Sequence, residues 1–122
     1  MNSYEKYLRL VFENSERVKE PFFCGNLFVG RLADNVIIKA KLFVSRHTAN
    51  HSLHISIQRA GYLLDKQEFD MSVLGATGIL HKRDSDVWEV LVMVDPNAVH
   101  DFVFRYVDLI TKNEGGKRNE CI

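Results

Sequence analysis

The chain has 122 residues, 46% of them hydrophobic, and its 16 basic residues are balanced by 16 acidic ones. This length supports one domain with its own core, and the balanced charge argues against a chain whose main task is to bind nucleic acid. No signal-like segment is visible, no stretch reaches the roughly 18 apolar residues of a membrane span, and the two cysteines form no disulfide framework. We therefore expect a soluble cytoplasmic protein.

The charge is divided unevenly along the chain. Residues 1–61 hold nine Lys or Arg and five Asp or Glu, whereas residues 62–122 hold seven and eleven. We expect these opposite charges either to pair within the fold or to guide head-to-tail association of two chains.

Residues 4–19 are predicted to form an amphipathic helix that ends before Pro21. Its apolar stripe consists of Tyr4, Tyr7, Leu8, Val11 and Val18. Opposite charges stand four residues apart on its other side, in the order that favours ion pairs within a helix. These pairs are Glu5 with Arg9 and Glu13 with Arg17.

The clearest strand pattern covers residues 36–69, where apolar and polar residues alternate in two arms around the loop 47–51. The arms are predicted to pair as a hairpin with one buried face, to which Val36, Ile38, Ala40, Leu42, Val44, Leu53, Ile55 and Ile57 contribute. A first strand is expected over 22–32, with a tight turn at Asp34 and Asn35. After a turn or bulge at Ala60 and Gly61, a further strand is expected over 62–69, and another hairpin over 78–94.

A C-terminal helix is expected to begin with Asp95 as its cap and Pro96 in its first turn, and to end at Gly115 and Gly116. Its apolar stripe is Val99, Phe102, Val103, Tyr106, Val107 and Ile110. Its outer face repeats the spacing of opposite charges in Asp101 with Arg105 and Asp108 with Lys112. Phe104 and Leu109 fall outside the stripe, so we expect them to need cover from elsewhere.

These elements predict an α+β fold, with a mainly antiparallel sheet of five or six strands and the N- and C-terminal helices packed on one face. The domain is expected to cover residues 1–116 and to be followed by a disordered tail over 117–122.

The second face of this sheet is the candidate binding site, because it mixes polar and large apolar side chains. The residues expected to bind a ligand there are Lys39, Lys41, Phe43, His54, Gln58, Glu89, Leu91 and Met93. A curved sheet would form a pocket for a small molecule, whereas a flat one would form a protein-recognition face of an adaptor, chaperone or inhibitor.

Association of two chains is indicated by residues 87–93, which carry apolar side chains on both faces of the predicted strand. The two helices can cover only one of these faces. We therefore expect a homodimer, the commonest form of symmetric oligomer.

Other chemistry has weaker support in the sequence. His47, His51 and His54 are close in sequence but lack the spacing of a metal motif, so no metal or cofactor is expected. An acid–base pair could join His54 or His81 to Glu89 or Asp65.

No nucleophile elbow, phosphate-binding loop or Cys-x-x-Cys motif is present, and no catalytic residue is assigned. Cys24, in an apolar strand, is expected to be a small buried side chain rather than a nucleophile. A basic surface of Lys39, Lys41, Arg46 and Arg59 with Phe43 is interpreted as ordinary exposed charge rather than as a nucleic-acid site.

Overall fold

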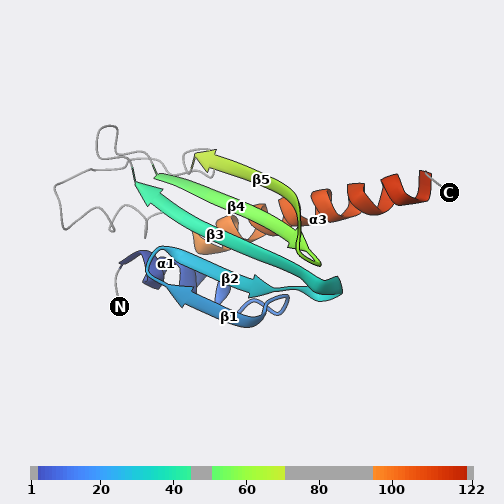
Figure 1. Cartoon of the computed structure of the whole chain (residues 1–122). Coiled ribbons are helices and arrows are strands. Elements are labelled where there is room, and N and C mark those ends of the chain that lie inside the picture. The colour runs from blue at the N-terminus through green and yellow to red at the C-terminus, as the bar shows by residue number, and fades with distance from the viewer. Residues whose placement is uncertain (1–2, 45–50, 71–94, 121–122) are drawn as a thin grey trace.

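The computed structural model describes residues 3–44, 51–70 and 95–120 and has the predicted α+β architecture (Figure 1). Its elements are α1 (Ser3–Phe12), β1 (Lys19–Cys24), β2 (Leu27–Arg31), the short 3-10 helix η1 (Ala33–Asn35), β3 (Val36–Val44), β4 (His51–Arg59), β5 (Tyr62–Asp70) and α3 (Pro96–Glu120). Five antiparallel strands follow one another across the sheet in chain order. Both helices cover one face, with α1 behind β1 and β2 and α3 behind the rest (Figure 1). In the described ranges no helix has the length and apolar character of a membrane span.

The central hairpin is confirmed. β3 pairs with β4 from Val36 opposite Arg59 to Val44 opposite His51, and the predicted inner residues between these ends are buried. The turn at Asp34 and Asn35 is also confirmed, since both residues adopt left-handed backbone angles, with φ of 61° and 62°. The predicted hairpin over 78–94 lies outside the described residues.

The prediction of a single strand over 22–32 is wrong, because the chain turns at Gly25 and Asn26 and pairs β1 with β2. Gly25 has a φ of 60°, a conformation that glycine adopts without steric cost. The Asn26 side chain donates to the Leu42 carbonyl oxygen at 3.0 Å, which anchors this turn to β3. The local turn chemistry therefore overrides the apolar run.

The prediction of a helix over 4–19 is also wrong at its end. α1 stops at Phe12, and the Ser15 amide then donates to the Phe12 carbonyl oxygen at 3.2 Å in a turn. Val18 still packs on the core, but from the segment that enters β1. Its position in the helical stripe was a coincidence of spacing.

One expected ion pair forms within α1 and another is exchanged for a longer-range pair. Glu5 and Arg9 lie 3.3 Å apart, as predicted. Arg17 instead binds both carboxylate oxygens of Asp108 on α3, at 3.0 and 2.6 Å. This pair joins the basic half of the chain to the acidic half.

The core lies between the sheet and the two helices. Phe12 of α1 stacks on Phe28 of β2 with ring centroids 4.1 Å apart, and meets Phe104 of α3 edge to face at 6.3 Å. The prediction that Phe104 needs outside cover is therefore wrong, because α1 buries it to 4% exposure, whereas Leu109 is 58% exposed. Gly30 is required beneath this cluster, because a Cβ atom there would stand 2.6 Å from the Phe28 ring.

α3 begins as predicted, with the Asp95 carboxylate accepting the Asn97 amide at 2.9 Å and Pro96 in the first turn. The predicted end at Gly115 and Gly116 is wrong, because the helix continues through them to Glu120. Glycine lowers helix stability by only about 1 kcal/mol relative to alanine, so it does not by itself end a helix.

Candidate functional site

The face of the sheet that points away from both helices is called here the open face. Alternation along each strand, fixed by the register of the ladder, places its side chains. Its members are Phe22, Cys24, Leu27, Val29, Arg31, Ile37, Lys39, Lys41, Phe43, Ser52, His54, Ser56, Gln58, Leu63, Lys66, Glu68 and Asp70.

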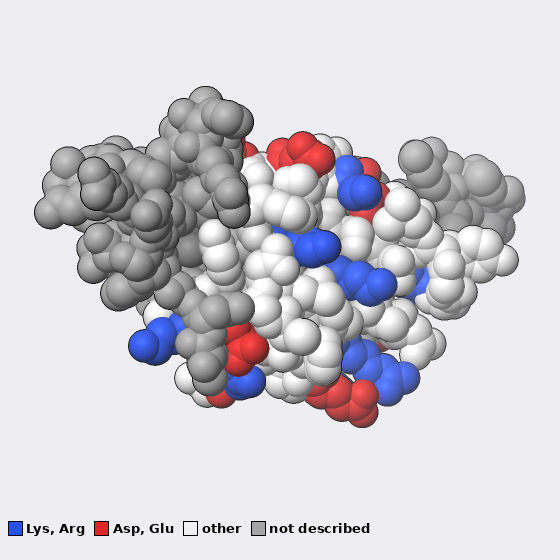
Figure 2. Space-filling view, turned by 60° about the vertical axis from the view of Figure 1, so that its left-hand side comes forward, with Lys and Arg blue, Asp and Glu red and all other residues white. Residues whose placement is uncertain are grey.

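Two lysines of β3 occupy the middle of the open face. Lys39 lies between Val29 and Ser56 in the ladder, and Lys41 lies between Leu27 and His54. Figure 2 shows basic side chains across the middle of the visible surface, with acidic ones toward its upper and lower edges. Among the described residues neither lysine has an ion-pair partner.

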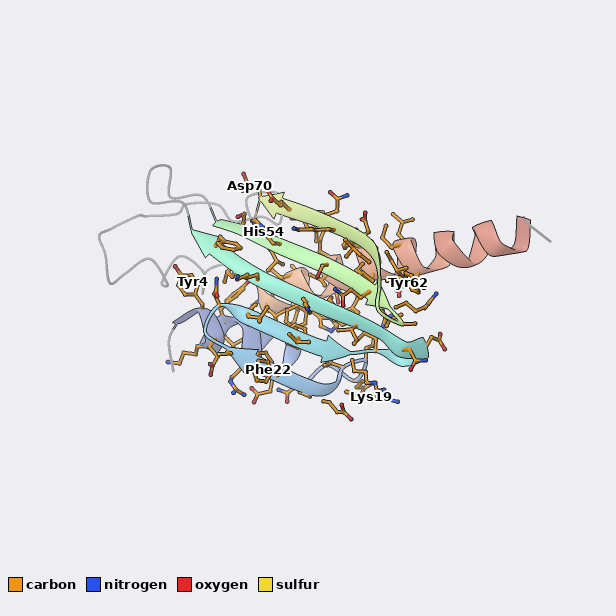
Figure 3. All side chains as sticks on the ribbon, in the orientation of Figure 1. Tyr4, Lys19, Phe22, His54, Tyr62 and Asp70 are labelled. Atoms are coloured by element: carbon orange, nitrogen blue, oxygen red, sulfur yellow. The ribbon has the colours of Figure 1, made fainter. Side chains whose placement is uncertain are left out.

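A group of five side chains, called here the His54 cluster, forms around the histidine of β4; Figure 3 labels His54 on that strand. The His54 ring packs on Phe43 with centroids 4.4 Å apart, and the Lys41 ammonium lies 5.5 Å from the Phe43 ring centre. His54 Nε2 is 3.2 Å from Ser52 Oγ, and His54 Nδ1 is 3.5 Å from Glu68 Oε1. Three of the predicted ligand-binding residues are thus brought into contact.

Large apolar side chains are exposed around this polar centre. Phe22 on β1 is 55% exposed, Leu63 on β5 is 57% exposed, and Ile37 and Phe43 on β3 are each 38% exposed. The sheet spacing of about 4.8 Å per strand separates the β1 and β5 side chains by roughly 19 Å. Exposed apolar side chains are therefore present on both edge strands and on β3, with polar side chains between them.

Five of the eight residues predicted to bind a ligand can be located in the structure. Lys39, Lys41, Phe43, His54 and Gln58 all belong to the open face. The remaining predicted residues, Glu89, Leu91 and Met93, lie outside the described residues, as does the predicted dimerisation strand at 87–93.

Sequence reasoning missed Glu68 and Phe22 as members of this surface. The pairing of His54 with Glu68 depends on a register shift between Ile57 and Gln58, where β5 gains an extra residue. Ser52, in contrast, was assigned to the polar side by the alternation of residues within β4.

Two alternatives considered in the sequence, a pair of Asp65 with His54 and a basic surface that includes Arg59, are not formed, and the expectation of a buried Cys24 is wrong. Asp65 does not meet His54, because it pairs across from Ile57 and accepts the Tyr106 hydroxyl at 2.5 Å on the helix side. Arg59 lies opposite Val36 and lines a cavity beside α3, so it adds no charge to the open face. Cys24 is exposed rather than buried.

The contacts from Glu68 to His54 and from His54 to Ser52 resemble those between the acid, the base and the nucleophile of a hydrolase. β4, however, is paired on both sides, so its backbone amides are engaged in the ladder and supply no oxyanion-binding donors.

The three histidines considered for metal binding are only partly within the described residues. His51 begins β4, and His47 lies outside the described residues. Within residues 3–44, 51–70 and 95–120 no three metal-binding side chains come together.

Cavities lined by described residues lie away from the open face. One of about 320 Å³ lies between η1, β4 and α3, one of about 560 Å³ lies along the outer side of α3, and one of about 440 Å³ lies where α1 meets α3. None of these three cavities is lined by residues of the open face.

Comparison with known proteins identifies no relative from which a role for these residues could be inferred. No family model, no curated protein sequence and no solved structure matches the chain.

Proposed function

We propose that this chain is a binding protein whose open face recognises an acidic, apolar surface of a partner protein. The observation that carries the proposal is the combination of exposed apolar side chains with Lys39 and Lys41, which lack ion-pair partners among the described residues. All five strands are held in one ladder, so this surface is preformed.

The extent of the apolar surface favours a protein over a small molecule. A small ligand gains affinity from a concave site that surrounds it, whereas protein interfaces bury about 800 Å² of a broad surface on each partner. Phe22 and Leu63, roughly 19 Å apart across the strands, cannot contact one small molecule together. Both can lie beneath a protein surface.

The charge on the open face defines the chemistry of the partner. Lysines in the middle of an interface need carboxylates opposite them, because an unpaired buried charge is costly. Arg31 already contacts Glu20 at 3.7 Å, and Glu68 already faces His54. Lys39 and Lys41 in the middle of the face, with Lys66 beside them on β5, are therefore the groups that select an acidic partner.

Synthetic peptides of alternating leucine and glutamate, or of alternating leucine and lysine, test this selection by fluorescence anisotropy. The acidic peptide is expected to bind, and the double variant Lys39→Glu/Lys41→Glu is expected to weaken it by roughly tenfold, because two exposed charge pairs each contribute about 0.5–1 kcal/mol. The loss is expected to shrink in high salt.

The matched control is Leu109→Ser, a substitution of an exposed apolar side chain on α3, away from the sheet. It is expected to leave peptide binding unchanged, whereas Ile37→Ser on the open face is expected to weaken it. Equal affinity for the two peptides, or no effect of the charge reversal, would exclude the proposal.

A small anionic ligand at the His54 cluster is the second candidate, favoured by the contact of Lys41, Phe43 and His54. The pair Lys41→Ala and His54→Ala would then abolish binding of that ligand. Substitution of Phe22 would have no effect on it, whereas Phe22 contributes to a protein interface.

A second copy of the chain is the partner that would give the predicted homodimer. A twofold axis parallel to β4 would place β3 of one copy over β5 of the other, and so bring Lys41 over Glu68. Light scattering during gel filtration distinguishes this case, because Lys41→Glu would then lower the molar mass.

A further inference from the structure

A second constellation of polar side chains lies on the helix side of the sheet, where the turn after α1 meets the start of α3. Ser15 Oγ is 2.8 Å from His100 Nε2, and His100 Nδ1 is 3.3 Å from Asp101 Oδ1. This is the arrangement in which a carboxylate orients an imidazole and the imidazole accepts a hydroxyl proton. It is independent of the open face and of the function proposed for that face.

The backbone and a buried ring fix this constellation. The Ser15 amide donates to the Phe12 carbonyl oxygen, and the Ser15 carbonyl oxygen accepts the Val18 amide, both at 3.2 Å. The His100 ring packs on the buried Phe104, with centroids 4.6 Å apart. Nucleophile and base are thus each held by structure that does not depend on a ligand.

A cavity of about 440 Å³ opens beside the hydroxyl and the imidazole. Ser15 and His100 both line it, together with Leu10, Val11, Asn14, Glu16, Arg17 and Asn97. The two aliphatic side chains suit a short acyl group, and the two asparagine amides are neutral hydrogen-bond donors. A site of this size accommodates a small molecule.

We propose that Ser15 is a nucleophile toward small carboxylic esters, with His100 as its general base. With Nδ1–H donated to Asp101, His100 Nε2 takes the hydroxyl proton as Ser15 Oγ bonds to the ester carbonyl carbon. The ester C–O bond then breaks, and His100 returns the proton to the leaving alcohol. Water, deprotonated by His100, then adds to the acyl carbonyl carbon. The bond from that carbon to Ser15 Oγ breaks, His100 returns the proton to Oγ, and the carboxylic acid leaves.

Two features stabilise the negative charge that develops on the carbonyl oxygen. Asn97, in the first turn of α3, lines the cavity, and the positive end of the helix dipole lies there. Asp101 is a positioning residue, and because its side chain is 70% exposed, its removal is expected to cost less than loss of the base.

Reaction of the intact chain with a fluorophosphonate, followed by mass spectrometry of its peptides, tests the assignment. One phosphonyl group is expected on Ser15, with labelling lost in Ser15→Ala and slowed about 100-fold in His100→Gln. Ser52→Ala is the matched control, because Ser52 also lies beside a histidine, at 3.2 Å, but faces no cavity described here. Labelling is expected to be unchanged in that variant.

Hydrolysis of p-nitrophenyl acetate supplies a second readout, with kcat/KM expected to fall about 100-fold in Ser15→Ala. Circular dichroism and the melting temperature verify that each variant is folded. Peptide mapping of the unaltered chain decides the question even if a variant unfolds. Label distributed equally between Ser15 and Ser52, or undiminished in His100→Gln, would overturn the assignment.

Discussion

Phe12→Ala is expected to lower the free energy of unfolding by about 3–5 kcal/mol, the range for truncating a buried aromatic side chain. Phe12 is fully buried and is the residue at which α1, β2 and α3 meet, through its contacts with Phe28 and Phe104. Its removal leaves a cavity between α1, β2 and α3, and these three elements would all have to move to fill it. Urea unfolding followed by circular dichroism measures the loss.

Phe22→Ala is the matched control for this effect, since it removes the same side chain from β1 on the open face, where it is 55% exposed. Its stability is expected to stay within about 0.5 kcal/mol of the parent. Comparable losses in the two variants would contradict the assignment of the two faces of the sheet.

Stability is expected to fall steeply above about pH 10, where an unfolded tyrosine ionises. Burial, with a contribution from Asp95, raises the pKa of Tyr7 above its ordinary value, and burial and the hydrogen bond to Asp65 raise the pKa of Tyr106. The folded state keeps these protons and the unfolded state loses them, so stability is complete below pH 10 and declines above it. For Tyr7 the slope approaches about 1.4 kcal/mol per pH unit.

Tyr7→Phe isolates this contribution, because the lysines that also titrate at alkaline pH are unchanged in the variant. Urea midpoints measured at pH 8 and pH 11 are expected to differ less in the variant than in the parent chain. Tyr106 is more exposed than Tyr7 and contributes less to the difference. An unchanged difference would show that Tyr7 ionises equally in both states.

Much of the fold was predictable because local and tertiary preferences agree. The alternation over residues 36–59 is required by a sheet covered on one side, and the turns at Asp34–Asn35 and Ala60–Gly61 use residues that occupy left-handed angles. The wrong element boundaries occur where local sequence preference and tertiary packing disagree. Val18 has helical spacing but follows a turn, and Gly25–Asn26 interrupts an apolar run that looked continuous.

The candidate site was predictable only within single strands. Alternation alone assigned Lys39, Lys41, Phe43 and His54 to one face. The partners from other elements depend on register and packing, which no local pattern contains. Glu68 reaches His54 through a bulge in β5, and Ser15 reaches His100 across 85 residues of sequence.

Backbone amide NMR during titration with the leucine–glutamate peptide tests the central claim most directly. The proposal predicts shifts concentrated on β3 and β4, around Lys39, Lys41 and His54, which are lost in Lys39→Glu/Lys41→Glu. Shifts confined to α3, or no saturable shifts at all, would contradict recognition of an acidic partner by the open face.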